Sequence, residues 1–163
     1  MSDKQGAASD KKAIKIVAQN RKARFDYHIE EVLETGVVLT GPEVKSLRAG
    51  KASLGDAYAR VREGELYLHS AHITPYSHAR AETLDPLRTR KLLAHKREIK
   101  RLLGKVKERG MSMVPLAIYF KEGRAKVELA LVRGKKLHDK REDIKKREQE
   151  REMRKAMKRS LKG

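Results

Sequence analysis

Hydrophobic and polar residues alternate along several short segments of the chain, a pattern typical of half-buried β-strands. The strands that it predicts cover residues 25–30, 37–39, 57–62, 66–68 with a continuation over 71–73, 114–120 and 126–132. Glu63-Gly64 and Glu122-Gly123 supply good turn residues, so the segments on either side of each dipeptide are predicted to form hairpins. Most of the predicted strands are therefore short and antiparallel.

Two segments between these strands carry helix signals. Pro42 fits the first position of a short helix, with Glu43 in its first turn and Gly50 as its stop. A longer helix is predicted from Asp85-Pro86 to Gly110, after a polar, loop-like stretch over 76–84. It has an apolar stripe at a period of 3.6 and a basic opposite face; the stripe consists of Leu92, Leu93, Ile99, Leu102, Leu103 and Val106.

The predicted elements favour a mainly β fold with flanking helices. Residues 25–132 are enough for one ordinary domain. Five or six short strands are too few for two packed sheets, whereas a small closed barrel leaves no exposed sheet edge. We therefore expect an OB-like antiparallel β-barrel with two to three helices and a basic C-terminal tail.

The net charge of +18 is concentrated at the two ends of the chain. Residues 133–163 hold fourteen Lys and Arg against six Asp and Glu, and residues 1–24 hold seven against two. Such a tail cannot bury enough surface to fold alone, and its charge suits a polyanion, above all nucleic acid. A membrane-surface helix would need larger apolar residues on one face than the tail offers: Ile144, Met153, Met157 and Leu161.

Composition gives little support to other classes of protein. The chain has no cysteine, no apolar run of the length that spans a membrane and no apolar segment behind its first lysines, so we expect a cytoplasmic protein. Its six histidines are scattered, and no Gly-rich phosphate loop is present. Glu30, Glu31 and Glu34 are more typical of a solvated strand than of an acid–base pair. We expect no enzyme activity, metal or cofactor.

Clusters of Lys and Arg precede the first strand, surround the short helix and open the long one. Aromatic residues are scarce, with two Phe and five Tyr, so base stacking along an extended single strand is poorly supported. Structured RNA, held by its shape and its phosphates, fits better.

Four motifs carry a resemblance to a known family. They are Asn-Arg-Lys-Ala-Arg at 20–24, Gly-Pro-Glu-Val-Lys-Ser-Leu-Arg-Ala-Gly-Lys at 41–51, Asp-Pro-Leu-Arg-Thr-Arg-Lys-Leu-Leu at 85–93 and Gly-Lys-Lys-Leu-His-Asp-Lys-Arg at 134–141. In order and spacing they resemble the bacterial SsrA-binding proteins, also called small protein B. Pro42 and Ala94 depart from the commonest family pattern. With the similarity beginning near Ile16, we divide the chain into a disordered N-terminus (1–15), the barrel with its helices (16–132) and a tail (133–163), disordered when free and helical on the ribosome.

The resemblance implies an adaptor that binds the tRNA-like part of transfer-messenger RNA and enters stalled ribosomes in trans-translation. The family pattern places on the RNA-binding side Asn20, Glu34 and Leu93, with Lys45, Arg48, Arg90 and Lys91 as basic neighbours. The basic clusters add Arg21, Lys22, Arg24 and Lys51 to this predicted RNA-binding set. Two alternatives stay open at this point: Leu93 as a core residue and Asn20 as a turn or cap residue.

The resemblance gives the tail a different partner, the ribosome. A contact with small-subunit RNA at the decoding centre is implied for Gly134, Lys135, Lys136, His138, Asp139, Lys140 and Arg141. Residues beyond Ile144 would form a helix along the vacant mRNA channel. Elongation factor Tu would be an indirect partner through the aminoacylated RNA, and we expect a monomer. A constitutive ribosomal protein with a tail in ribosomal RNA is the main alternative, and a nuclease is the weaker one.

Overall fold

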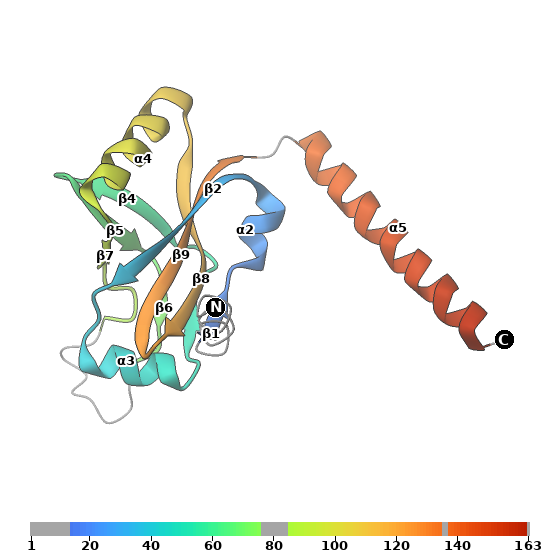
Figure 1. Cartoon of the computed structure of the whole chain (residues 1–163), viewed down its shortest axis with the longest axis horizontal. Helices are drawn as coiled ribbons and strands as arrows, with labels where there is room; N and C mark the ends of the chain where they lie inside the picture. Colours follow the sequence, from blue (N-terminus) through green and yellow to red (C-terminus); the bar gives the residue numbers. More distant parts are fainter. Residues whose placement is uncertain (1–13, 76–84, 135–136, 163) are drawn as a thin grey trace, which may run out of the picture.

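The computed structural model describes residues 14–75, 85–134 and 137–162 (Figure 1). Within these residues the chain forms nine strands and four helices. Their order is β1 (Ile14–Gln19), α2 (Arg21–Asp26), β2 (Tyr27–Val37), α3 (Gly41–Arg48), β3 (Ala52–Ser53), β4 (Tyr58–Arg62), β5 (Glu65–His69), β6 (His72–Ile73), β7 (Arg90–Leu93), α4 (Lys96–Arg109), β8 (Ser112–Lys121), β9 (Arg124–Gly134) and α5 (Leu137–Lys162).

Six of the strands close into a ring, which confirms the OB-like barrel predicted from the sequence. The order around the ring is β8-β4-β5-β7-β2-β9, and β9 pairs again with β8. Strand β1 lies outside the ring and pairs with β8 next to the place where β8 meets β4. All of these pairings are antiparallel, and the short β3 and β6 form a separate pair.

The barrel interior is filled by every second side chain of each strand, the one that points inward. Its fully buried aliphatic side chains include Leu66, Leu68, Leu92, Leu129 and Leu131. Burial of one such side chain stabilises the fold by about 1.5–3 kcal/mol. Helices α3 and α4 lie at opposite ends of the barrel (Figure 1) and add Leu47, Ile99 and Leu102 to the same core.

The two hairpin turns and the end of the long helix, all predicted from glycine residues, are confirmed. Glu63 and Gly64 have φ angles of 51° and 76°, and Glu122 and Gly123 have 52° and 77°, the pair of positive values that a two-residue hairpin turn requires. Helix α4 ends at Gly110, whose φ of 63° is left-handed. The start of α3 has a full capping box between Thr40 and Glu43.

Several strand predictions are corrected by the structure. Phe25 belongs to α2, because Asn20 caps a helical turn that delays the strand until Tyr27. Strand β2 then runs to Val37, so the separate strand predicted over 37–39 does not occur. The barrel domain is predicted to begin at residue 16, but strand β1 begins at Ile14, because residues from Ile14 onward pair with the edge of β8. The continuation over 71–73 is a separate strand, since Ser70 has a φ of 61°.

The long helix begins later than predicted, at Lys96 and not at Asp85. Arg90–Leu93 forms β7, a barrel strand that pairs with β5 on one side and β2 on the other. The apolar pair Leu92-Leu93 misled the sequence prediction, because consecutive leucines fit a helix as readily as a strand. The predicted loop over 76–84 lies outside the described residues.

Helix α5 projects away from the barrel (Figure 1). It starts at Leu137, before the predicted start beyond Ile144, because no Gly or Pro interrupts residues 137–162. The side chains described along it are mostly exposed, and it meets the barrel domain at α2, where the Arg147 guanidinium lies 5.3 Å from the centre of the Phe25 ring. The predicted disorder of the free tail stays a prediction, and residues 1–13 of the N-terminus predicted to be disordered (1–15) lie outside the described residues.

Candidate nucleic-acid interface

The side chain of Asn20 is buried, with only 5% of the residue exposed, and it forms hydrogen bonds to three separate parts of the chain. Its side-chain oxygen accepts from the Ala23 amide at 3.1 Å and so caps α2. Its side-chain nitrogen donates to the carbonyl oxygens of Leu54 at 3.2 Å and Pro115 at 3.1 Å. The cap alternative is therefore confirmed, and all three of these hydrogen bonds are made inside the protein.

By capping α2, Asn20 fixes the position of a basic helix. Arg21, Lys22 and Arg24 are exposed along it, in agreement with their predicted place at a surface. The Arg24 guanidinium lies 3.7 Å from a carboxylate oxygen of Glu128, and this partly exposed ion pair limits where Arg24 can point. The three cations therefore lie within one short capped helix, and their charge suits phosphate.

Glu34 lines the same hollow as Arg21 and Arg24, but it already has partners of its own. The Tyr119 hydroxyl donates to Glu34, and the Lys121 ammonium lies 3.6 Å from its other oxygen. Burial, together with the hydrogen bond to Glu34, raises the pKa of Tyr119 above its ordinary value. Tyr119 therefore stays protonated and keeps donating to Glu34.

A hollow of about 640 Å³ lies between α2 and the paired strands β2 and β9, which carry Glu34 and Glu128. Glu34 is directly opposite Glu128 in the register of β2 and β9, a pairing of like charges that costs stability unless cations are near. Arg21, Arg24, Glu34 and Glu128 all line the hollow. It thus offers both donors and acceptors, which suits a nucleotide with its phosphate and its base or ribose edges.

Helix α3 contributes a second basic surface. Lys45, Arg48 and Lys51 are exposed there, in agreement with their predicted surface positions. The Arg48 guanidinium lies 4.9 Å from the centre of the Phe120 ring. The negative face of the ring attracts the cation, and this contact limits the positions that the Arg48 side chain can adopt.

Arg90 is buried, with only 1% of its surface accessible. Its predicted place on the RNA-binding surface is therefore wrong. Its Nε donates to Glu43 Oε2 at 2.6 Å, and its two other nitrogens donate to the carbonyl oxygens of Ala71 at 2.7 Å and Pro86 at 3.2 Å. Inward-facing positions alternate with outward ones along β7, so Arg90 and Lys91 point to opposite sides. A prediction that treated the segment as helical missed this alternation.

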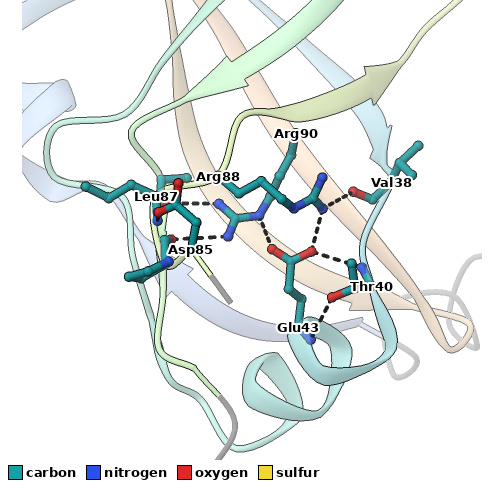
Figure 2. A network of polar contacts seen from close by, with 9 residues as sticks. Val38, Thr40, Glu43, Asp85, Leu87, Arg88 and Arg90 are labelled. Atoms are coloured by element: carbon teal, nitrogen blue, oxygen red, sulfur yellow. Dashed lines mark hydrogen bonds and ion pairs between the residues drawn. The ribbon is translucent and has the colours of Figure 1, made fainter. Parts of the chain in front are cut away.

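Glu43 is the centre of this buried network (Figure 2). Besides Arg90, the Arg88 Nη2 lies 2.5 Å from Glu43 Oε1, and the Thr40 amide donates to the same oxygen at 2.9 Å. Burial alone would raise the pKa of Glu43, but the hydrogen bonds from Arg88, Thr40 and Arg90 outweigh it and lower the pKa. The only role predicted for Glu43 is in the first turn of the helix, although the spacing of Thr40 and Glu43 is that of a capping box.

Lys91 and Leu93 face outward from β7, on the predicted RNA side. Lys91 donates to Glu65 Oε1 at 2.9 Å. Leu93 is 51% exposed, so the structure contradicts the alternative that it is a core residue. It packs beside Gly36, where an added Cβ would lie only 3.2 Å from the Leu93 Cβ. A larger residue at position 36 would therefore require Leu93 to move by a few tenths of an ångström.

The predicted ribosome contact lies where β9 passes into α5. Gly134 is exposed at the end of β9, and Arg141 is exposed on α5. Lys135 and Lys136 lie outside the described residues. The backbone of His138, Asp139 and Lys140 belongs to the first turns of α5, and their predicted contacts stay predictions.

No group of three or more His, Cys, Asp or Glu residues is placed to hold a metal ion in the described part of the chain. None of its helices is both long enough and apolar enough to cross a membrane.

Comparisons with known proteins point to one family. A family model described as SmpB protein matches residues 17–159. The SsrA-binding protein of Geobacter metallireducens is 57% identical over 143 residues, which is 88% of this chain and 94% of that protein. The SsrA-binding protein of Thermosynechococcus vestitus is 54% identical over 147 residues, or 90% and 97% of the two chains. A solved structure described as "tmRNA-SmpB: a journey to the center of the bacterial ribosome" matches with a TM-score of 0.63 and 52% identity, over 77% of this chain and 86% of that one.

Proposed function

The chain belongs to the SmpB protein family, and on this premise we propose that it binds the tRNA-like part of transfer-messenger RNA and delivers that RNA to stalled ribosomes for trans-translation. The observation that carries the proposal is the extent of the match. Residues 17–159 include both the barrel and most of α5, so the chain has the RNA-binding body and the tail together.

The barrel surface supplies the affinity for the carrier RNA in this proposal. Arg21, Lys22 and Arg24 on α2 and the exposed cations of α3 contact phosphates, while Glu34 accepts from a ribose hydroxyl or a base amino group. Leu93 packs against an exposed base or ribose, since half of it is accessible. Asn20 and Arg90 act through the elements that they position.

The tail acts on the ribosome. Residues 134–141 meet small-subunit RNA at the decoding centre, and the rest of α5 lies in the mRNA channel that a truncated message leaves empty. The positive charge of the tail suits this phosphate-lined path. Elongation factor Tu is reached only through the aminoacylated RNA, and the protein works as a cytoplasmic monomer.

Binding without catalysis is part of the same proposal. The constitutive ribosomal protein is not supported, because the relatives carry the name SsrA-binding protein. A nuclease would shorten bound RNA with time, and intact RNA after prolonged incubation with the pure protein is the expected result.

The test is affinity purification of the full chain from a bacterial host, followed by sequencing of the bound RNA. One dominant tRNA-like species is expected, present in substoichiometric amounts relative to ribosomes. Recovery of ribosomal RNA alone, with the protein at equal stoichiometry to every ribosome, would refute the proposal.

A further inference from the structure

Strands β4, β5 and β7 present an outward face that the sites above leave largely unused. The register places Tyr58 opposite His69 and Arg60 opposite Tyr67. On the other side of β5, Tyr67 is opposite Lys91. Since side chains two residues apart point to the same side of a strand, these five residues share one surface, which we name the aromatic face.

The aromatic face combines stacked rings with cations. The rings of Tyr58 and His69 are stacked, with their centres 5.1 Å apart and their planes 14° from parallel. Tyr67 is half-buried in the next row, and its hydroxyl donates to Glu65 at 2.8 Å. Tyr58 is 39% exposed, which leaves ring surface available to a third partner.

The charge of the aromatic face favours an anion. Arg60 and, at its margin, Arg62 are exposed, and neither forms an ion pair with any residue in the described ranges. Lys91 is paired with Glu65, the single carboxylate in these rows. Aromatic rings interleaved with arginine are the means by which barrel surfaces hold unpaired nucleotides, through stacking and phosphate contacts.

The aromatic face is continuous with the proposed binding surface for the carrier RNA. Lys91 belongs to both. At the other edge, Tyr58 and Arg60 line a hollow of about 700 Å³, and Lys22 on α2 lines the same hollow. In Figure 1 the β4–β5 hairpin and α5 lie on opposite sides of the barrel, so the tail leaves this face open.

We propose that the aromatic face binds unpaired nucleotides of transfer-messenger RNA, next to the part of that RNA held by α2 and α3. The inference rests on the proposed function and adds a surface and a class of ligand to it. Bases stack on Tyr58 and Tyr67, and Arg60 and Arg62 contact the phosphates between them. Sequence composition argued against stacking because aromatic residues are few, but the strand register gathers two of the five tyrosines and a histidine on one face.

The test uses the full chain with both tyrosines replaced by leucine, Y58L/Y67L, and the matched control Y58F/Y67F. Both double variants lose the hydroxyls, but only the phenylalanine variant keeps the rings. Two probes are used: full-length transfer-messenger RNA and a labelled, unstructured ten-nucleotide oligouridylate. We expect Y58L/Y67L to lose at least about tenfold in affinity for both probes, whereas Y58F/Y67F stays within about twofold of the parent chain.

Three results separate the possibilities. Equal binding of transfer-messenger RNA by the parent chain and Y58L/Y67L would overturn this inference and leave the proposed function standing. No binding of that RNA by the parent chain would overturn the proposed function itself. A loss that appears only when ribosomes are added would also overturn the inference, because the face would then contact the ribosome.

Cross-linking gives an independent readout of contact. Transfer-messenger RNA containing 4-thiouridine is irradiated with the parent chain, and the attached peptides are identified by mass spectrometry. Cross-links on β4 or β5 are expected, and cross-links confined to α2, α3 and β7 would contradict the inference.

Discussion

The guanidinium of Arg90 and the carboxylate of Glu43 form a buried ion pair, with Nε 2.6 Å from Oε2 and the two side chains 1% and 7% exposed. The pair joins β7 to the start of α3, two elements 47 residues apart that both carry outward cations. Arg88 and the Thr40 amide complete the shell around the carboxylate (Figure 2). The network therefore fixes how the basic surface of α3 is placed relative to Lys91 and Leu93.

Replacing Arg90 by alanine leaves the Glu43 charge buried with fewer partners. The R90A variant is expected to lose about 3–5 kcal/mol of unfolding free energy. The neighbouring K91A variant breaks an exposed pair with Glu65 and is expected to lose less than about 1 kcal/mol. Urea denaturation of both variants measures the difference. Similar stabilities for R90A and K91A would show that the buried pair does not hold the fold.

The same network predicts a dependence of stability on pH. The pKa of Glu43 is lowered in the folded state from 4.5, so its charged form is stabilised by folding. This contribution is complete above about pH 5 and is lost as pH falls through the folded pKa. The E43Q variant, which does not titrate, is expected to be less stable near pH 7 and to lose less stability between pH 5 and pH 3. A parallel loss in both proteins would exclude Glu43 as a source of the dependence.

Asn20 is expected to matter for stability more than for direct RNA contact. The N20A variant loses the α2 cap and both hydrogen bonds to buried carbonyls, at a cost of about 2 kcal/mol or more. The N20S variant keeps a capping oxygen but loses the two donated bonds, so it should lie between N20A and the parent. Thermal unfolding measures the order. If N20S is as unstable as N20A, the cap contributes nothing.

Gly36 and Leu93 should be coupled in RNA binding. In the G36A variant the new Cβ lies 3.2 Å from the Leu93 Cβ, so β7 must shift by a few tenths of an ångström and Leu93 with it. We expect weaker binding of transfer-messenger RNA by G36A. The matched control is G104A on α4, where the added Cβ meets nothing within 4 Å and alanine should stabilise the helix by about 0.5–1 kcal/mol. Unchanged RNA affinity in G36A would contradict a role for the Leu93 position.

Much of the fold could be predicted from local signals in the sequence. The turns at residues 63–64 and 122–123, the Gly110 cap and the β8–β9 hairpin depend on neighbouring residues alone, and their predictions are confirmed. Strand β7 could not be recognised in this way. Arg90–Leu93 is a strand because β5 and β2 pair with it from 22–26 and 55–57 residues away, respectively, and no local pattern encodes those partners.

In the candidate site, too, only the features that depend on local sequence could be predicted. The exposure of Arg21, Lys22 and Arg24 follows from charge alone, and their prediction agrees with the structure. Arg90 and Asn20 carry equally polar side chains, yet their hydrogen-bond partners lie up to 95 residues away and draw them inside. A motif shared with a family identifies such residues as important without saying whether they touch RNA or position the residues that do.

The measurement that tests the central claim most directly is the affinity of transfer-messenger RNA for the chain ended after Gly134. If the barrel binds the RNA and the tail acts on the ribosome, the truncated chain should bind the RNA within about threefold of the full chain at moderate salt. In a reconstituted translation system it should add no tag to stalled peptides. Loss of RNA binding by the truncated chain, or normal tagging with it, would contradict the account.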